Sequence, residues 1–529
     1  MKLKAEQWIN FFKNNKEKSS LLNRVFSNLV KYEDYFLSLP MYQNHHIIFN
    51  KKYGFANFNE YSASWLAQAL NEIVFQNESQ KIFISIENEK FNFKSLNHFK
   101  DKLSLIEHQI YQFNNSNISN FNFAYYASKK MNMDYLIHFN YYEKEDVVDI
   151  LIYNFKRGFD NFLLDIKIKE LFEYLENNDL NNLDYKENKT LPIDYDFYLD
   201  EYTSNNHLLK AFRNIKQRYK TTNLINSKNI HCLNETEFLL NRYNKQFLKN
   251  YIKEKNIHYL YKNKLIGNLF YRNKKINNIF NFDSNNNLTV ITRLKEKYLY
   301  LNNHNLSLIY LDFFLQELKI DGEMNLNNFF VVLPVNAPKT LKILLNRYKV
   351  NIKYENDDLD QLIKNPNCLF YYNENRFIPN PRFFFYYDNY YFLVCLIWMF
   401  NSLLNRNNLL TYKWEQLKDN LGEIIFKNKE VKIKELKNDW LDILKKNDLK
   451  KNDFSLEIIN FKNDLFHYLF KIKTNNNHQI IVKKNNFNNQ IIIEYQLITE
   501  YHETINNIFF DYLKIKKIIK KLIKTIDKK

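Results

Sequence analysis

Short β-prone runs alternate with amphipathic helical patterns along most of this 529-residue chain. In its first part, strands predicted at 81–86 and 135–139 are separated by helical patterns at 96–113 and 124–131. Strands that alternate with helices in this way form a mixed or parallel sheet covered by helices. The alternation therefore predicts an α/β fold, and 529 residues exceed what a single hydrophobic core can hold.

The stretch 369–422 is the clearest α/β segment. A β-prone run and a polar loop lead through a proline-marked turn into an apolar block at 390–400. Asp388 precedes that block and can cap a helix, because its short side-chain oxygen accepts hydrogen bonds from free N–H groups. Such a layout typically holds a ligand loop, and the loop here carries one carboxylate, Glu374.

The middle of the chain repeats the alternation. Pro192 is expected to open a second unit, with helices predicted at 205–221 and 235–255. Strands are expected at 278–282 and 288–292, on either side of a polar loop.

The last part of the chain follows a different pattern. A helical run predicted at 430–446 precedes three predicted strands, at 465–473, 478–482 and 490–496. Strands in series joined by short polar connections indicate antiparallel hairpins. The prediction for the whole chain is therefore three α/β domains followed by a small α+β C-terminal domain, bounded at 1–180, 181–292, 293–422 and 423–529.

Glycine is scarce, which limits the chemistry that loops can perform. There are five glycines in 529 residues, against roughly 7% in an average protein. Phosphate-cradling loops need clustered glycines, because only these let several backbone N–H groups converge on an anion. The five are isolated, so the sequence holds no P-loop or dinucleotide fingerprint, and nucleotide-phosphate chemistry is disfavoured.

The charge and the cysteine content bear on the partners and the cellular compartment of the protein. The net charge is +17, with lysines spread along the chain, which favours a solvated basic surface over nucleic-acid or anionic-membrane contact. Cys232, Cys368 and Cys395 show no metal-ligand spacing and no disulfide framework, so we expect a reducing cytosol. The charged start resembles no signal peptide, and 390–400 is shorter than the ~20 residues of a membrane span. A soluble, cytoplasmic protein is predicted.

The order of units resembles the phosphohexomutase family, the phosphoglucomutases and phosphomannomutases. Those enzymes have three similar α/β domains and a fourth α+β domain. Near the N-terminus, a helix containing Trp8 precedes Tyr53-Gly54-Phe55-Ala56-Asn57-Phe58-Asn59, which is similar to the family's Phe-Gly-Thr-Ala-Gly-Leu-Arg segment. The resemblance covers nearly the whole chain and implies that fold, while every family motif is altered.

The resemblance places the family's phosphoserine motif, Thr-Ala-Ser-His-Asn-Pro, at the loop Phe139, Asn140, Tyr141 and Tyr142. No serine occurs between Ser128 and Ser204, so the nucleophile is missing and no catalytic residue is predicted. A tyrosine is longer than serine by a ring and would displace the reacting oxygen.

The family's metal motif, Asp-Gly-Asp-x-Asp-Arg, corresponds to 282–287, where Asp283 is the one carboxylate. Mg²⁺ favours several charged oxygens, so Asp283 is a doubtful metal ligand and is better explained as a turn former. The predicted cofactor is none, with Mg²⁺ implied only if the chain is an active mutase. His45 and His46 do not suggest a metal pair, because adjacent strand residues point to opposite faces.

Two further motifs imply weak substrate contacts. The sugar-binding Gly-Glu-x-Ser-Gly loop corresponds to 371–377 and keeps only Glu374. The phosphate-binding Arg-Pro-Ser-Gly-Thr-Glu-Pro loop corresponds to 483–489 and keeps two cations, Lys483 and Lys484. The residues themselves favour a simpler interpretation, in which Glu374 is a solvated loop carboxylate and Lys483 and Lys484 are exposed charges of a hairpin.

The C-terminal segment has an apolar stripe with lysines between its members. The stripe comprises Ile508, Tyr512, Ile515, Ile519, Leu522 and Ile526. Such a helix fits packing on its own domain, docking on a partner helix, or contact with an acidic membrane surface.

Together these features predict a catalytically inactive phosphohexomutase homologue that serves as a structural or adaptor subunit of a cytosolic assembly with other protein subunits. The abundance of Asn, Lys, Ile, Phe and Tyr suggests an AT-rich coding sequence, as in a reduced-genome bacterium, and a cytoskeletal or motility complex is one such assembly. One alternative is an active or residual phosphoglucomutase or phosphomannomutase that interconverts sugar 1- and 6-phosphates. Another is a basic nucleic-acid-associated protein, although nucleic acid is a less favoured partner.

Overall fold

The computed structural model divides the chain into two compact units. The first comprises Met1–Asn206 and Asn229–Phe238, and the second comprises His207–Lys228 and Leu239–Lys529. The residues described are 2–26, 38–43, 45–51, 54–114, 118–143, 145–156, 160–180, 187, 189–204, 221–227, 233–234, 236–237, 248–250, 276–283, 285–294, 297–320, 325–356, 358–381, 386–408, 410–432, 454–462, 466–474, 478–485, 490–499, 513, 517 and 520.

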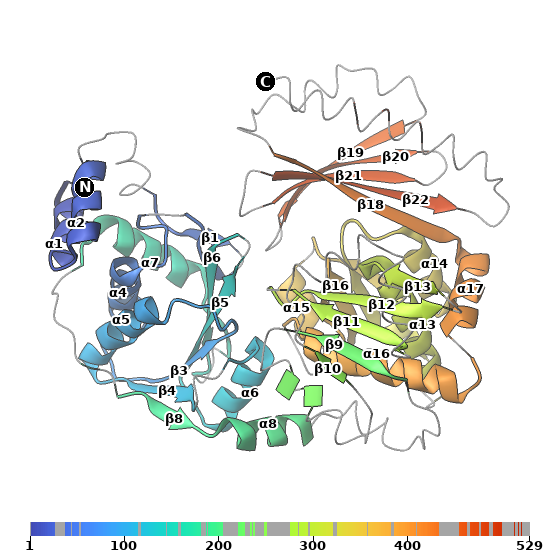
Figure 1. Cartoon of the computed structure of the whole chain (residues 1–529), viewed down its shortest axis with the longest axis horizontal. Coiled ribbons are helices and arrows are strands. Elements are labelled where there is room, and N and C mark those ends of the chain that lie inside the picture. Colours follow the sequence, from blue (N-terminus) through green and yellow to red (C-terminus); the bar gives the residue numbers. More distant parts are fainter. Residues whose placement is uncertain are drawn as a thin grey trace. The chain divides into compact units, whose positions relative to one another are not determined.

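The first unit is built on an eight-stranded sheet, coloured blue to green in Figure 1. Its strand order is β1-β2-β6-β5-β3-β4-β8, and β7 pairs with β6. The central strands β4, β3 and β5 run parallel, whereas β5, β6 and β2 are antiparallel, so the expected mixed sheet is confirmed. The strands are β1 (Met41–Gln43), β2 (His46–Phe49), β3 (Lys81–Ile86), β4 (Gln109–Phe113), β5 (Tyr135–Tyr142), β6 (Val147–Asn154), β7 (Asn161–Phe162) and β8 (Leu191–Ile193).

Helices cover this sheet and build its core. Trp8 stacks on Tyr61 with ring centroids 5.1 Å apart and lies 4.6 Å from the ring of Phe55. The tryptophan helix and the Phe55 segment, which the resemblance linked, therefore share one hydrophobic cluster. The helices are α1 (Lys2–Phe11), α2 (Lys16–Phe26), α4 (Glu60–Ala69), α5 (Phe93–Leu103), α6 (Phe121–Lys130), α7 (Asp165–Asn177) and α8 (Tyr195–Ser204).

Two expectations for this unit need correction. The helix predicted at 96–113 ends at Leu103, because Glu107 adopts the left-handed conformation (φ 57°), and β4 then pairs with β3. Pro192 does not open a second unit: it lies in β8, which pairs with β4 at the edge of the first sheet. An edge strand tolerates proline because one of its sides needs no N–H donor.

The second unit contains three sheets. Two are mixed, with orders β10-β9-β11-β12-β13 and β15-β14-β16-β17, and the third is antiparallel, with order β18-β22-β21-β20-β19. These sheets follow the expected sequence of α/β layers and a closing antiparallel layer. The strands are β9 (Asn223–Asn226), β10 (Leu248–Asn250), β11 (Asn278–Phe282), β12 (Leu288–Leu294), β13 (Lys297–Leu301), β14 (Phe330–Leu333), β15 (Asn351–Tyr354), β16 (Cys368–Asn373), β17 (Arg376–Ile378), β18 (Glu423–Lys432), β19 (Phe454–Lys462), β20 (Phe466–Thr474), β21 (Gln479–Asn485) and β22 (Gln490–Thr499).

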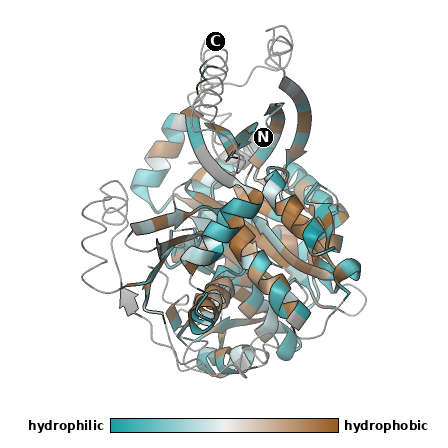
Figure 2. Cartoon of the chain, turned by 90° about the vertical axis from the view of Figure 1, so that its right-hand side faces the viewer, coloured by the Kyte–Doolittle hydropathy of each residue, from teal (hydrophilic) through white to brown (hydrophobic). Residues whose placement is uncertain are grey.

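The buried helix predicted after Asp388 is confirmed. Asp388 caps α16 by accepting a hydrogen bond from the Tyr391 N–H at 2.8 Å, and the helix is buried from Asn389 to Leu403. Hydrophobic and hydrophilic bands alternate along the helices in Figure 2, as packing of one face requires. The helices are α13 (Asn303–Ile320), α14 (Lys339–Arg347), α15 (Leu359–Lys364), α16 (Asn389–Asn405) and α17 (Leu410–Leu421).

Two helical predictions in this unit are wrong where the structure describes them. The run predicted at 430–446 begins inside β18, which pairs with β22 over its whole length. The helix predicted at 235–255 contains β10, which pairs with β9. Cross-strand pairing outweighs helix propensity in both places. The helix predicted at 205–221 lies almost wholly outside the described residues.

The C-terminal stripe also lies outside the described residues, which include only Leu513, Lys517 and Lys520 in this segment, all helical and exposed. Within the described ranges, none of the helices combines the length and apolarity that crossing a bilayer requires.

Candidate functional site

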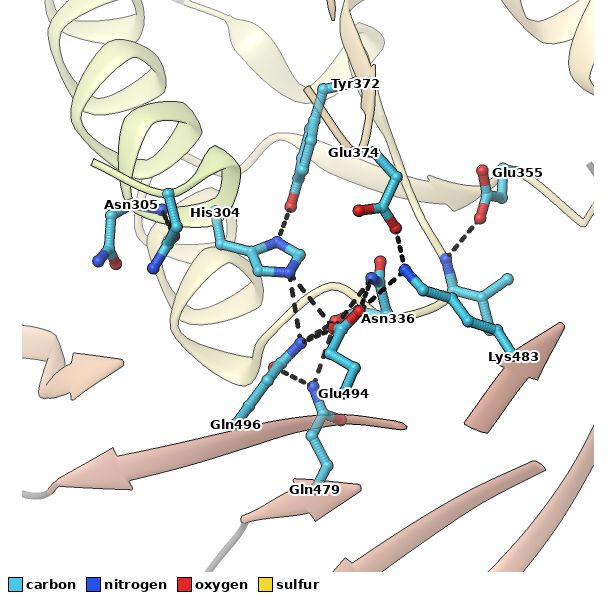
Figure 3. A network of polar contacts seen from close by, with 12 residues as sticks. His304, Asn305, Asn336, Glu355, Tyr372, Glu374, Gln479, Lys483, Glu494 and Gln496 are labelled. Carbon is cyan, nitrogen blue, oxygen red and sulfur yellow. Dashed lines mark hydrogen bonds and ion pairs between the residues drawn. The ribbon is translucent and has the colours of Figure 1, made fainter. Parts of the chain in front are cut away.

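The two segments predicted to contact substrate meet within the second unit. Glu374 lies in the turn between β16 and β17, where Asn373 pairs with Arg376. Lys483 lies on β21, and its ammonium forms an ion pair with the Glu374 carboxylate (Figure 3). Glu374 has φ 51°, a conformation that costs a non-glycine residue about 1–2 kcal/mol.

Lys483 is a buried cation with several partners. Its side chain is 1% exposed, and its Nζ also lies 3.0 Å from Oε2 of Glu494 on β22. The rings of Phe466 and Tyr468 lie 4.3 and 5.6 Å from the ammonium. Burial alone would lower the pKa of Lys483, but the two carboxylates outweigh burial and hold that pKa above its ordinary value. Lys483 is therefore protonated, and Glu374 and Glu494 balance its positive charge.

Glu494 is the centre of this network. Asn336 donates to both of its carboxylate oxygens at 3.0 Å, and Gln496 donates to Oε1 at 2.8 Å. Nε2 of His304 lies 3.8 Å from Oε1. Burial would raise the pKa of Glu494, but Lys483, His304 and the hydrogen bonds lower it overall. A fully buried carboxylate thus stays ionised.

The same network joins three elements. Gln479 and Gln496, from the antiparallel sheet, donate to the backbone carbonyl of Asn336 between β14 and α14, at 3.3 and 2.7 Å. A 2.7 Å hydrogen bond links His304, on α13, to the hydroxyl of Tyr372, on β16. Figure 3 shows these side chains converging from the sheet and the layer that it faces. The arrangement holds the antiparallel sheet against the β14–β17 layer.

Lys484, the second predicted cation, lies away from the network around Glu494. It follows Lys483 on the same strand, so its side chain projects from the opposite face of the sheet, beside His467 in the ladder. It is half-buried there.

Asp283 organises its own loop. Its Oδ1 accepts hydrogen bonds from the backbone N–H groups of Asn285 and Asn287, at 2.8 and 3.0 Å. Its Oδ2 accepts from the Asn287 side chain at 3.1 Å. These are the contacts of a turn-forming aspartate. Among the described residues, no three His, Cys, Asp or Glu side chains gather where they could share a metal ion.

Asn389 ties the predicted metal and sugar loops together. Its side-chain N–H group donates to the carbonyls of Asn286 and Asn375, at 2.7 and 2.9 Å. Its side-chain oxygen accepts from the N–H of Phe377 at 2.9 Å. One buried amide at the start of α16 thus fixes both loops.

The predicted phosphoserine loop requires correction, because it is part of a strand. Phe139 to Tyr142 continue β5 and pair with β6 up to Tyr142 and Val147. The Tyr141 hydroxyl donates to Asp146 at 3.0 Å, and burial raises the pKa of Tyr141 to about 12. The aromatic and β-prone character of these residues favours a ladder over an open loop.

Sequence reasoning missed a serine–histidine–glutamate cluster in the first unit. The Ser85 hydroxyl lies 2.7 Å from Nδ1 of His138, and Nε2 of His138 lies 3.2 Å from Glu87. Ser85 and His138 face each other on β3 and β5 and are 1% and 0% exposed. The residue types suit nucleophilic catalysis, but a serine buried within a strand cannot reach a substrate, so the cluster is structural.

His45 and His46 contact different partners, but His45 precedes β2 with φ 68° and does not belong to the strand predicted there. His46 forms a buried pair with Asp149 at 2.8 Å, whereas Nδ1 of His45 contacts the carbonyl of Leu163 at 3.2 Å.

No family model matches this sequence, and no curated protein matches it either. Solved structures do match. A phosphoglucomutase/phosphomannomutase family protein of Burkholderia thailandensis superposes with a TM-score of 0.59 at 10% identity, over 91% of this chain and 96% of that chain. The open form of the Paramecium phosphoglucomutase parafusin gives a TM-score of 0.60 at 8% identity, over 88% and 92%. The chain therefore has the phosphohexomutase fold, as the sequence resemblance implied.

Proposed function

We propose that this chain is a catalytically inactive protein of the phosphohexomutase fold that serves as a structural or adaptor subunit of a cytosolic protein assembly. The ion pair between Lys483 and Glu374 carries the proposal. These two residues are what remains of the phosphate and sugar loops, and each neutralises the other. A sugar phosphate would have to displace Glu374 and also compete with Glu494 for the same ammonium.

Two further observations support inactivity. The segment that aligns with the phosphoserine motif is a paired strand whose candidate acceptor, the Tyr141 hydroxyl, is already bonded to Asp146. Phosphoryl transfer needs a nucleophile positioned in line with the phosphate. The residues at the metal motif do not suit Mg²⁺ either, since Asp283 is the one carboxylate there and its oxygens accept loop N–H groups.

A mutase assay tests inactivity directly. The purified chain is incubated with glucose 1-phosphate, a bisphosphate primer and Mg²⁺, and with mannose 1-phosphate in parallel. We expect no turnover above a heat-treated control. Turnover of either sugar phosphate that disappears in a Tyr141→Phe variant would overturn the proposal and establish the mutase alternative.

The adaptor role is tested separately. Native mass spectrometry and size-exclusion chromatography of gently lysed source cells should place the chain in a complex of defined mass with other protein subunits, for example one of a cytoskeletal or motility system. A chain that migrates as a monomer at its native concentration would contradict this role, whatever the outcome of the assay.

A further inference from the structure

The edge strands of the four sheets differ in how they are protected. An edge strand leaves one row of backbone N–H and C=O groups unpaired, and this row can pair with another chain. Six edge strands in the described part of the chain are short: β1, β8, β10 and β17 have three residues each, β15 has four and β13 has five. β8 also contains Pro192, which lacks an N–H. Shortness and proline are ordinary protections of a sheet edge.

The two edges of the antiparallel sheet, β19 and β18, are longer and differ from each other (Figure 1). β19 has nine residues, but its register with β20 shifts between Ile458 and Phe461, where Asn460 is left-handed with φ 48°. Such a bulge bends an edge and interrupts its row of backbone groups. β18 has ten residues and keeps an unbroken register with β22 from its first residue to its last. Among the described strands, β18 is therefore the long edge that carries no bulge or proline.

The middle of β18 is accessible from both faces of the sheet. Asn428, Lys429 and Glu430 are all exposed. Asn428 pairs with Glu494, so Asn428 and Glu430 belong to the face of the network and Lys429 to the opposite face. None of the described strands pairs with the outer side of β18. A ten-residue row of backbone groups thus has an exposed centre with one charge of each sign.

We propose that the outer edge of β18 binds an extended segment of another protein, which adds to the antiparallel sheet as a further strand. In this mode of recognition, main-chain hydrogen bonds supply affinity and the side chains of the added strand supply specificity. Opposite charges that face each other across two strands attract. The segment that fits therefore has an acidic residue opposite Lys429 and, next to it, a basic residue opposite Glu430. This inference rests on the proposed adaptor role and names the kind of partner that the adaptor binds.

A second copy of this chain fits the edge less well. Residues that lie opposite each other in antiparallel strands project from the same face, so Glu430 of a second copy cannot lie opposite Lys429. Glu423 is the remaining acidic residue of β18, and in the register that sets it opposite Lys429, Glu430 lies opposite Gly422. No antiparallel register of two β18 strands satisfies both charges.

Hydrogen–deuterium exchange of the full-length chain tests this inference. Exchange is measured first on the purified chain and then on the complex isolated from gently lysed source cells. In the purified chain, alternate amides of β18 should exchange fast, because every second N–H of an edge strand points away from its neighbour. In the complex, these amides should exchange at least tenfold more slowly, whereas the amides of β19 should exchange alike in both samples.

Proline variants measure what the edge contributes. Lys429 and Glu430 direct their N–H groups to opposite sides of the strand, so one of Lys429→Pro and Glu430→Pro removes an N–H that points away from β22. That variant should keep the urea midpoint of the wild type and lose the complex in native mass spectrometry, whereas the other should lower the midpoint. Glu457→Pro and Ile458→Pro, on β19, are the matched pair, and the one that keeps the midpoint should retain the complex.

The outcomes separate this inference from the adaptor role. Slow exchange of all β18 amides in the purified chain would mean that a second copy or the chain itself occupies the edge, and would overturn the inference. A complex in which the outward amides of β18 stay fast, or one that survives the fold-keeping β18 proline variant, would also overturn it while leaving the adaptor role intact. A chain that is monomeric in the lysate would contradict both. The exchange measurement does not depend on how the variants fold.

Discussion

Lys483, on β21, and Lys471, on β20, are the same residue type on the same face of one sheet, yet their environments are opposite. Both are almost fully buried, at 1% and 6% exposure. Two carboxylates hold the pKa of Lys483 above its ordinary value, whereas burial beside other lysines lowers that of Lys471 to about 8. Burial alone therefore does not decide the state of a lysine. Glu374 and Glu494 form ion pairs with Lys483, whereas Glu457 and Glu494 act on Lys471 only at longer range and do not offset its burial.

The two lysines consequently have different uses. The polar side chains around Lys483 pair with one another and hold the antiparallel sheet against the β14–β17 layer. Lys471, by contrast, forms no ion pair or hydrogen bond with the residues that the structure describes, and Glu457 and Glu494 offset only part of the effect of its burial.

The largest effect is expected from Lys483→Met. This change leaves the buried Glu494 carboxylate without its cation, which typically costs about 3–5 kcal/mol. Urea unfolding, followed by hydrogen exchange of β21 and β22, measures the loss. The double variant Lys483→Met/Glu494→Gln should lose less than the single one. Lys484→Met, on the opposite face, is the control, and an equal loss there would show that the network has no special role.

Acidification should weaken the same network to a smaller extent, because a protonated carboxyl group can still form hydrogen bonds. The folded-state pKa of Glu494 is depressed, so its contribution is present above the ordinary carboxyl pKa of about 4.3 and is lost as pH falls below that value. Thermal unfolding between neutral and acidic pH measures this slope. Glu494→Gln should flatten it, and an unchanged slope in that variant would contradict the assignment.

Lys471→Met should raise the stability of the protein, whereas Lys483→Met should lower it. Replacing a buried charge that has no ion pair among the described residues by an apolar side chain of similar length should stabilise the second unit by about 1–3 kcal/mol near pH 7. The folded-state pKa is lowered, so wild-type stability should rise as pH increases from about 8 toward the ordinary lysine pKa of about 10.4. The difference between variant and wild type should shrink over that range, and a constant difference would remove the electrostatic explanation.

The smallest effect is expected for Glu374→Gln. Lys483 keeps Glu494, and the side chain of Glu374 is 19% exposed, so solvent screens part of the lost attraction. We expect a loss of about 1 kcal/mol in thermal unfolding. Glu374→Gly, which also relieves the left-handed backbone of the turn, should lose less than Glu374→Gln. A loss as large as that of Lys483→Met would mean that Glu374, and not Glu494, is the main partner.

The local sequence pattern was sufficient to predict much of the fold. Alternation of apolar runs predicted the parallel core of the first sheet and the three strands β20, β21 and β22, because side chains alternate between faces at every second residue. Asp388 was identifiable as a cap from its position alone. The pattern failed at β4, β10 and β18, where pairing with a neighbouring strand outweighs helical propensity.

The candidate site was only partly visible in the sequence. Family resemblance drew attention to Glu374 and Lys483, but no local feature indicated that they are each other's partners. Glu494 had one available signal, a single charge within the apolar run Ile491-Ile492-Ile493-Glu494. His304 and Asn336 had none, because they act through contacts made more than a hundred residues away.

The sequence by itself determined the order of layers and the absence of a serine between Ser128 and Ser204, since these depend on residue identity and periodicity. Only the tertiary structure decided which charges are paired. The folded chain places Glu374 and Glu494 in ion pairs with Lys483, whereas none of the carboxylates that the structure describes forms an ion pair with Lys471. Electrostatic energy depends on distances between side chains that chain order does not specify.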